Sequence, residues 1–563
     1  MTEILPPEMK KQFQEAMELI KNSTDIKIYS HTDCDGISSG AILTSILQRL
    51  GKKVEIKIVN LDALEDVEIN HELTIFSDLG SGQPVDKNAA KDSKILILDH
   101  HPPLRDIDYC NTVEYYYLEI NPIFYGIDGS QEICGGGLCY LLAKEFGYKD
   151  LSWIGILAAI GDIQNGKTGR LEGLNRLILK DAEEEGLVNV IKEDISLYGR
   201  QTRALYESLS YFSDVKLPFK NTNEILDWLK DKKINTQNPI TKTSIKPCDL
   251  NIEEKELLIR ELGKLIVMRI PKRYWQHAEK LIKGESYEFI KEMKYKFLRD
   301  ASEFSTAMNA CVRNNKPEVA LNLLLLTINR YEIIDEILIE NKFELLMEIE
   351  NDIQKTFEKM NDEDIAVFGK VQNKIIELLN QIYEEKRKIN DKIENKKFRA
   401  LNITKDGNIT ESGNEKTRLE VLNELEDIRK EHKSYLAENI EKISEQDIIQ
   451  KDNLQYFNGK DIRSNVVGTI AGMVLNKGDW RKPIIAFAPL NEGSEILKLS
   501  LRCSKLLAYD GVHFGSIIRK VSQSLGGNGG GHDVACGAYI HKDQKEEFFD
   551  MMNKELEGKL VLD

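Results

Sequence analysis

Basic residues are scarce in this sequence relative to acidic ones. Lys and Arg total 77 against 93 Asp and Glu in 563 residues, which gives a formal net charge of −16. This balance disfavours nucleic-acid binding through a broad basic surface, because phosphate attraction depends on Lys and Arg. It does not exclude a local nucleic-acid site, since metal ions supply positive charge wherever carboxylates gather.

Paired cysteines and long apolar runs are also missing. The eight cysteines are scattered without a C-x-x-C pair, which excludes a disulfide framework and indicates a reducing, cytoplasmic compartment. No apolar run approaches the length needed to cross a bilayer, and the N-terminus lacks the pattern of a signal peptide. We therefore expect a soluble cytoplasmic protein of three or four domains with no membrane partner.

Short apolar runs alternate with helical patterns in residues 1–190. Strands separated by helices form parallel sheets, so this part of the chain is expected to be a parallel α/β sheet. The predicted strands are Ile26–Ser30, Val54–Val59, Leu73–Ser77, Ile95–Leu98 and Thr112–Glu119.

Polar side chains directly follow several of these strands. In open α/β sheets, ligands bind beyond the carboxyl ends of the strands, so side chains at those ends are candidates for one site. The candidates are His31, Asp33 and Asp35 after the first strand, Asp78 after the third, Asp99, His100 and His101 after the fourth, and Asp162 after the apolar helix Leu151–Ile160.

Divalent metal ions account for this set of residues. Carboxylates brought together repel each other and raise each other's pKa, and a cation removes the repulsion. Histidine and aspartate without thiolate favour Mn²⁺, with Mg²⁺ as the alternative, and the ligands suffice for two ions. Alone, Asp78 or Asp162 would be interpreted as a helix cap or turn residue. The prediction of a metal centre therefore depends on the whole set.

Four motifs carry a family resemblance. In chain order they are HTDCDG from His31, SDLG from Ser77, LDHH from Leu98 and AAIGD from Ala158, and together they resemble the motifs of the DHH phosphoesterases. Near the C-terminus, GGNGGGH at 526–532 and the strand Leu499–Ser504 resemble the DHH-associated C-terminal domain. Residues 300–313 resemble an element of RecJ-type nucleases, especially archaeal ones.

The resemblance implies a role for each candidate. Asp78 would bridge two metal ions, His101 would face the substrate phosphate, and Asp99 would orient a ligand through a hydrogen bond. The ligands would be completed by His31 and Asp33 for the first ion, and by Asp35, His100 and Asp162 for the second. Substrate binding would fall to His101, Arg502, Gly529, Gly530, Gly531 and His532.

The expected architecture has four parts. They are a DHH catalytic domain at 1–190, a helical middle region at 191–335 in which strands fade, a coiled-coil-like helical hairpin at 336–450, and a smaller α/β substrate-binding domain at 451–563. Within the hairpin, a polar loop near Asn402–Lys416 should precede a returning helix at Leu419–Ile443. The hairpin is interpreted as a spacer, or as a docking arm for replication or repair proteins or for a second copy of the chain.

Two further stretches allow two interpretations each. The glycines at 135–137 open a helix, where they could cradle a phosphate or permit close packing of the helix against the sheet. The run Pro271–His277 mixes cations with aromatics, which suits stacking on a single strand and equally suits a half-exposed helix start.

Two neighbouring ions can clamp the attacking and leaving oxygens of a phosphoryl group. Combined with the resemblance, this chemistry predicts a metal-dependent exonuclease on single-stranded DNA or RNA, acting 5′ to 3′ on DNA in replication or repair. The alternatives are an exonuclease of opposite polarity that also takes RNA, a small-oligonucleotide phosphoesterase, and a replication scaffold. A eukaryotic replicative-helicase subunit of this family has lost metal ligands, whereas every expected ligand is present here.

Overall fold

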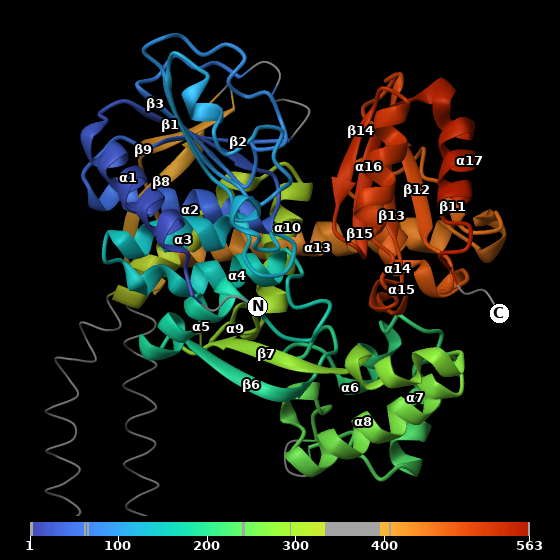
Figure 1. Ribbon diagram of the computed structural model, residues 1–563. Coiled ribbons are helices and arrows are strands. Elements are labelled where there is room, and N and C mark those ends of the chain that lie inside the picture. Colours follow the sequence, from blue (N-terminus) through green and yellow to red (C-terminus); the bar gives the residue numbers. More distant parts are fainter. Residues whose placement is uncertain are drawn as a thin grey trace, which may run out of the picture.

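The computed structural model describes residues 4–60, 64, 67–238, 242–292, 294–332, 394–404 and 407–560. These residues form two large sheets, each covered by helices, with a mainly helical region below them in the view of Figure 1. The predicted α/β class, with a parallel N-terminal sheet and a smaller C-terminal α/β domain, is confirmed.

Among the described residues, the N-terminal sheet contains seven strands. They are β1 (Ile26–His31), β2 (Glu55–Val59), β3 (Leu73–Ser77), β4 (Lys94–Leu98), β5 (Tyr116–Ile120), β8 (Lys397–Ile403) and β9 (Asn408–Thr417). Their order across the sheet is β5-β4-β3-β1-β2-β9-β8. Strands β1 to β5 run parallel, and β9 pairs antiparallel with both β2 and β8.

Strand order reverses between β1 and β3. From β1 the chain moves to β2 on one side and then returns to β3 on the other side. The connections that follow β1 and β3 therefore leave in opposite directions, which opens a crevice beyond the carboxyl ends of these strands. Ser30 pairs with Ser77 across the two strands, so His31 and Asp78 follow side by side.

Helices cover one face of this sheet, and loops and turns that carry Leu64, Val67 and Val85 cover the other. The helices include α1 (Pro7–Asn22), α2 (Cys34–Arg49), α3 (Gly135–Glu145), α4 (Ser152–Gly161), α5 (Leu174–Glu184) and α10 (Ala301–Arg313). Helix α4 is apolar on every side and packs against α2, α3, α5 and α10, which is the position that an all-round hydrophobic helix must take. Its Trp153 stacks with Phe304 of α10 and ties residues far apart in the sequence into one core.

The middle region is built on a two-stranded antiparallel ribbon. Its elements are β6 (Val188–Ile195), α6 (Leu205–Ser210), α7 (Thr222–Asp231), α8 (Ile252–Val267), β7 (Lys283–Phe289) and α9 (Lys296–Arg299). The expectation that strands fade after residue 190 is therefore wrong. Charged residues interrupt the apolar pattern of β6, and its pairing partner β7 follows only after α8, so local sequence does not reveal the ribbon.

The polar loop expected near Asn402–Lys416 is also wrong. These residues belong to β8 and β9, which extend the N-terminal sheet beyond β2. Ile409 is fully buried opposite Ile56, and the Lys27 ammonium donates to both Glu55 and Asn408. Pairing with an existing sheet edge and burial of one face override the loop-like composition.

The returning helix is present as α13 (Arg418–Lys442). Leu425 packs into the core of the N-terminal sheet, whereas Leu436 packs into a core of the C-terminal domain. Helix α13 thus runs from one domain to the other, as the orange helix in Figure 1 shows. The first helix of the predicted hairpin falls within 336–393, outside the described residues. The predicted domain boundaries stay a prediction. Within the segment predicted as the hairpin, β8 and β9 join the N-terminal sheet and the start of α13 packs on it.

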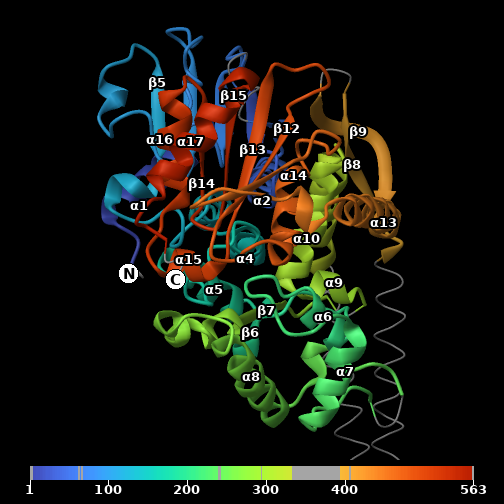
Figure 2. The same ribbon diagram turned by 90° about the vertical axis from the view of Figure 1, so that its right-hand side faces the viewer.

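Within residues 407–560, the C-terminal sheet contains six strands. They are β10 (Ile449–Gln450), β11 (Gln455–Asn458), β12 (Ile484–Pro489), β13 (Ile496–Arg502), β14 (Asn528–Gly531) and β15 (Ala535–His541), in the order β10-β11-β12-β13-β15-β14. The helices are α14 (Val467–Met473), α15 (Lys505–Tyr509), α16 (Phe514–Ser524) and α17 (Lys545–Glu555). Helices α16 and α17 cover one face of the sheet, and α14 packs on the other (Figure 2).

The glycine-rich stretch near residue 530 forms a strand. Asn528–Gly531 forms β14, which pairs with β15 at the edge of the sheet. This edge faces the N-terminal domain (Figure 1). Glycines are unfavourable in most strands, and here they permit α16 to approach, because a Cβ on Gly529 would lie 2.5 Å from the Ser522 Oγ of that helix.

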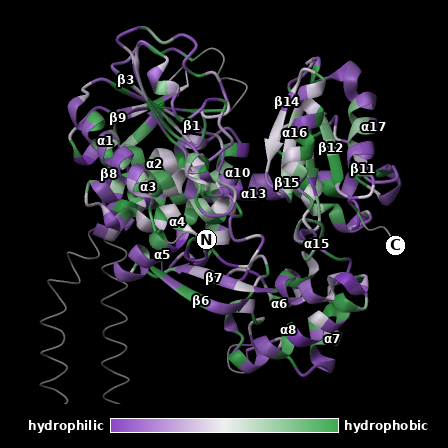
Figure 3. Ribbon diagram, viewed as in Figure 1, coloured by the Kyte–Doolittle hydropathy of each residue, from purple (hydrophilic) through white to green (hydrophobic). Residues whose placement is uncertain are grey.

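Hydrophobic residues concentrate in the strands and along the inner faces of the helices, with hydrophilic residues outside (Figure 3). Among the described helices, none is both long enough and apolar enough to cross a membrane.

Asn322 anchors β8 to the helical residues 317–332. Its side chain donates to the Leu401 carbonyl and accepts from the Leu401 N–H, both at 2.8 Å. We predict that Asn322→Ala lowers the free energy of unfolding by about 1–3 kcal/mol, because two buried backbone groups lose their partner. Urea unfolding measures the loss.

Gln48→Ala is the matched control, because it removes an exposed hydrogen bond to Glu411 on the same sheet. Its effect should stay within about 0.5 kcal/mol. Equal losses in the two variants would contradict an anchoring role for Asn322.

Candidate metal centre

The residues predicted for the first ion gather beyond the end of β1. His31 ends the strand, and Asp33 caps α2 by accepting a hydrogen bond from the Gly36 N–H at 2.9 Å. His31 Nδ1 lies 2.9 Å from Asp33 Oδ2 and 3.4 Å from Asp78 Oδ2. Each of these three residues presents a ligand atom within 4.8 Å of the others.

The residues predicted for the second ion form an adjacent group. Asp35 lies in the first turn of α2, His100 follows β4, and Asp162 caps the C-terminal end of α4. His100 Nε2 lies 3.6 Å from Asp35 Oδ2 and 3.8 Å from Asp162 Oδ2. The structure thus brings both predicted ligand sets together from four separate segments of the chain.

Asp78 lies between the two groups. Its Oδ2 faces His31, and its Oδ1 is 3.2 Å from His100 Nε2. A carboxylate with one oxygen towards each group is in position to bridge two ions. The φ of Asp78 is 59°, in the left-handed region that few non-glycine residues adopt, so its surroundings must hold it there. Gly135 contributes, because a Cβ at that position would lie 2.6 Å from the Asp78 Cβ.

The glycines at 135–137 hold Asp35. The N–H groups of Gly135 and Gly136 donate to Asp35 Oδ2 and Oδ1 at 2.8 and 2.6 Å. A Cβ on Gly136 would lie 2.4 Å from the Ala158 Cβ, so the glycines permit close packing, here against helix α4 as well as against Asp78 at the end of β3. The N–H groups of Gly135 and Gly136 therefore bind a carboxylate of the chain and are not available to a substrate phosphate.

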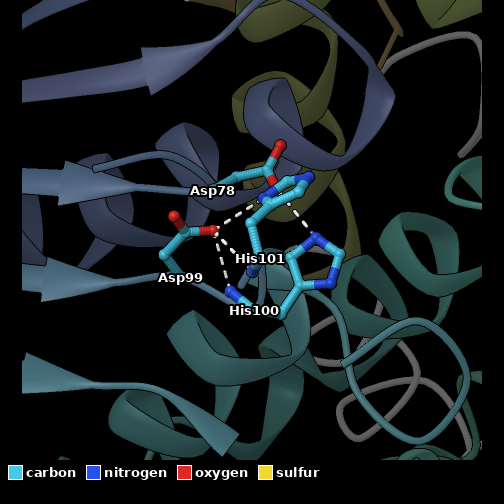
Figure 4. A group of neighbouring side chains, drawn as sticks. All are labelled: Asp78, Asp99, His100 and His101. Atoms are coloured by element: carbon cyan, nitrogen blue, oxygen red, sulfur yellow. Dashed lines mark hydrogen bonds and ion pairs between the residues drawn. The ribbon is translucent and has the colours of Figure 1, made fainter. Parts of the chain in front are cut away.

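Asp99 and His101 lie beside the ligand groups (Figure 4). Asp99 Oδ1 accepts hydrogen bonds from the backbone N–H groups of His100 and His101 and contacts His101 Nδ1 at 2.8 Å, and Oδ2 accepts from the Ser81 N–H at 2.9 Å. Although Asp99 lies within 4.8 Å of neighbouring ligand atoms, its oxygens are occupied in positioning the two histidines. His101 is 32% exposed and reaches the open side of the site.

Buried negative charge dominates the electrostatics. Burial raises the pKa of Asp78 well above its usual range, and the charges of Asp35 and Asp33 raise it further. Burial by itself would lower the pKa of His31, but the Asp33 and Asp78 carboxylates raise it well above its usual 6.5. Burial and the charge of Asp162 raise the pKa of Asp35. Without a cation, the site therefore retains protons that its residues would otherwise release.

The donor set fits a hard divalent cation. Asp78 Oδ2 is buried and has no hydrogen-bond partner among the described residues, which is unfavourable unless a cation completes the site. Cys34 lies between two of the ligands, but burial and the charges of Asp33 and Asp35 raise its pKa, so its thiol stays neutral. Carboxylate and imidazole donors without thiolate suit Mn²⁺ or Mg²⁺.

Arginines approach the site from α10 and from the C-terminal sheet. Burial, with a smaller contribution from the charge of Arg502, lowers the pKa of Arg313 to about 10, and Asp33 acts in the opposite direction. Burial lowers the pKa of Arg502 as well. Among the described residues, no carboxylate lies within ion-pair distance of either guanidinium. Arg313 was not among the predicted site residues, and the only available signal was its place in the RecJ-like stretch 300–313.

The C-terminal domain reaches the metal centre through His532. Its Nε2 lies 2.8 Å from Asp162 Oδ1, and the attraction of Asp162 raises the pKa of His532. The predicted substrate-binding glycines Gly529, Gly530 and Gly531 precede it on edge strand β14. In an edge strand, alternate N–H groups point away from the sheet, here to the side that faces the N-terminal domain, and the Gly529 N–H donates to Asn528 Oδ1 at 2.8 Å.

The run Pro271–His277 forms a short helical turn that contacts the C-terminal domain. Tyr274 is buried, and Arg273 pairs with Asp510, which directly follows α15. Trp275 remains about half exposed beside Lys272. Of the two interpretations, the structural one holds for Arg273 and Tyr274.

Two family models match the sequence. Residues 25–160 match the DHH family N-terminal domain, and residues 451–558 match the DHHA1 domain. The first match contains every predicted metal ligand except Asp162. The second contains Arg502 and His532.

One curated relative and two solved structures extend this comparison. An uncharacterized protein of Methanocaldococcus jannaschii is 26% identical over 537 residues, which are 94% of this chain and 92% of the relative. RecJ of Thermus thermophilus in complex with Mn²⁺ is 13% identical with a TM-score of 0.49, covering 99% of this chain and 55% of that chain. This chain thus spans about half the RecJ length. CDC45 of Entamoeba histolytica is 13% identical with a TM-score of 0.49, covering 97% of this chain and 98% of that chain.

We predict that Asp78→Asn abolishes stabilisation by Mn²⁺ while stabilising the metal-free protein at pH 7 by about 1–3 kcal/mol. Asparagine keeps the side-chain shape and tolerates the left-handed backbone. It removes the buried carboxylate that both ions would share as a ligand. Thermal melting with and without Mn²⁺ measures both effects. Asp227→Asn, at a carboxylate that is 80% exposed, should melt and respond like the wild type. A normal Mn²⁺ response in Asp78→Asn would contradict the shared-ligand assignment.

Mn²⁺ affinity should increase with pH. The carboxylates around His31 and His100 raise both pKa values above 6.5 against the opposing effect of burial, so protons compete with the metal. A folded-state pKa above the unfolded value means that the metal-free protein gains stability from these histidines below pH 6.5 and loses it as pH rises through their folded-state pKa. Calorimetric titration between about pH 6 and pH 8 should show tighter binding at the higher pH, with proton release. A pH-independent affinity would contradict this.

Proposed function

This chain belongs to the DHH superfamily, and on that basis we propose that it is a metal-dependent exonuclease that hydrolyses phosphodiester bonds of single-stranded nucleic acid. The observation that carries the proposal is the pair of ligand groups sharing Asp78, with Arg313 and Arg502 nearby and without carboxylate partners. A phosphodiester needs cations on its reacting oxygens and donors for its remaining oxygens, and this arrangement offers both.

The residues of the chain have separate tasks in this proposal. Mn²⁺ ions held by the two groups, or Mg²⁺ ions in their place, would polarise the phosphoryl oxygens and lower the pKa of an attacking water. Asp99 holds His101 through Nδ1, which directs Nε2 to the open side. In its imidazolium form, His101 would donate the Nε2 proton to a phosphate or leaving oxygen.

Substrate binding would join the two domains. Arg313 ends α10 on the N-terminal side, whereas Arg502 ends β13 of the C-terminal sheet. Guanidinium groups bind phosphate through paired N–H donors, so one phosphate between them would be held by both domains. His532 and the donors of β14 would assist from the same edge.

The finer assignments follow the resemblance to RecJ-type nucleases. We propose digestion of DNA in the 5′ to 3′ direction during replication or repair, with replication or repair proteins, or a second copy of the chain, as partners of the 336–450 region. The scaffold alternative is less well supported, because a scaffold has no need of a complete ligand set or of the strained Asp78 backbone. Opposite polarity, RNA cleavage and small-oligonucleotide hydrolysis are outcomes that the same experiment distinguishes.

End-labelled single strands of DNA and RNA test the proposal. The protein with Mn²⁺ should release mononucleotides from the 5′ end of DNA, and Asp78→Asn should reduce the rate to background. Arg313→Gln should raise KM about 10-fold or more through loss of a charged hydrogen bond, while leaving Mn²⁺ binding unchanged. Arg269→Gln, at an exposed arginine of the middle region, is the matched control. If purified, metal-loaded protein cleaved none of these strands and no short oligonucleotide, the proposal would be wrong.

A further inference from the structure

Two tyrosines and an arginine form an exposed cluster in the middle region. Arg203 Cζ lies 4.5 Å from the ring centroid of Tyr211 and 5.3 Å from that of Tyr198. The two tyrosine rings are 6.4 Å apart and steeply inclined to each other. Tyr198 and Tyr211 are 40% and 43% exposed, although their neighbours Leu197 and Phe212 pack into the hydrophobic core of this region.

The surrounding contacts do not account for this cluster. In the part of the chain that the structure describes, no carboxylate lies within ion-pair distance of Arg203, and neither tyrosine hydroxyl makes a hydrogen bond. The loop is nevertheless shaped around the arginine. Gly199 has a φ of 78°, and a Cβ there would lie 2.4 Å from Arg203 Cδ. The cluster therefore presents two aromatic faces and one unneutralised cation to solvent.

The loop that carries the cluster is anchored to α10. The Gln201 N–H donates to Glu303 Oε1 at 2.7 Å, and the Thr202 hydroxyl bonds the other oxygen of Glu303. Glu303 lies in the first turn of α10, and Arg313 lies at the last. A helix of 13 residues spans about 20 Å, so an extended strand held at Arg313 reaches the cluster within several nucleotides.

The same segment also borders the C-terminal domain. Asp214, three residues after Tyr211, accepts a hydrogen bond from the Lys505 N–H at the start of α15 at 2.8 Å. Figures 1 and 2 both place α6, which lies between Arg203 and Tyr211 in the sequence, close to where these parts of the chain converge. The cluster is thus near the junction of the three regions that flank the metal centre.

We propose that Tyr198, Arg203 and Tyr211 form a stacking platform for bases of the single strand, several nucleotides from the bond that is cut. The proposal rests on the proposed nuclease function and adds a second contact with the substrate. Every base has a π-face, so aromatic side chains and arginine hold a strand irrespective of its sequence. In a chain of net charge −16, such stacking supplies affinity that a broad basic surface does not.

The double variant Tyr198→Ala/Tyr211→Ala tests the platform. Initial rates are measured on a dinucleotide and on a single strand of about ten nucleotides, a length in the range of known stacking sites. KM for the longer strand should rise on the order of 10- to 100-fold, as expected for the loss of base stacking. Rates on the dinucleotide should not change, because it does not reach the cluster.

Tyr116→Ala is the matched control, because Tyr116 is a similarly exposed tyrosine on β5 at the far edge of the N-terminal sheet. It should leave both substrates unaffected. The conservative variant Tyr198→Phe/Tyr211→Phe retains the aromatic faces and should behave like the wild type. An unchanged KM for the longer strand in the alanine variant would overturn the proposal, as would an equal loss on the dinucleotide.

A measurement of strand binding tests the platform independently of the nuclease function. If the wild type hydrolyses neither substrate with Mn²⁺ or Mg²⁺, the proposed function fails, and fluorescence anisotropy of the labelled longer strand still tests the platform. Weaker binding by the alanine variant than by the wild type supports the platform without the nuclease. Equal binding by the two proteins overturns it.

Discussion

The accumulation of buried carboxylates at one reversal of strand order is the constraint on which the rest of this structure depends. Asp33, Asp35, Asp78 and Asp162 converge there from three segments, and burial makes their repulsion stronger. Hydrogen bonds from backbone N–H groups offset part of this repulsion. Gly36 donates to Asp33, and the start of α3 donates to Asp35. The remaining charge leaves the site suited to divalent cations.

The same constraint explains why the second domain approaches where it does. His532 contributes an imidazole to Asp162, and Arg313 and Arg502 contribute positive charge from two different directions. His532 is attracted by Asp162 and Arg313 by Asp33, so these two groups reduce the electrostatic cost of the cluster, and both are donors suited to phosphate. In the proposed function, these donors would turn to the substrate once metal ions neutralise the carboxylates.

Helix α13 determines how the two sheets face each other. At its start, the buried Arg418 bonds Glu292 and Glu394, and its later residues pack into the C-terminal domain. Loss of one partner from a buried ion pair of this kind is strongly destabilising, because the other charge stays buried without compensation. This helix thus links the sheet that carries the candidate metal ligands to the sheet that carries Arg502 and His532. This explains why a segment with a coiled-coil-like pattern is integral to the site.

The parallel sheet and the candidate ligand residues at its carboxyl edge could be predicted from the sequence alone. Short apolar strands, each followed by Asp or His, specify a local pattern, and the geometry of parallel sheets brings the ends of such strands together. The residues predicted for the two ions, from His31 to Asp162, could therefore be found without coordinates. The three-dimensional structure was needed to show that 397–417 joins this sheet, that the glycines before His532 form an edge strand, and that Arg313 feels the charge of Asp33. These features depend on pairing and burial between residues far apart in the chain. The local sequence pattern of a polar strand or a helix end does not indicate which residues it will contact.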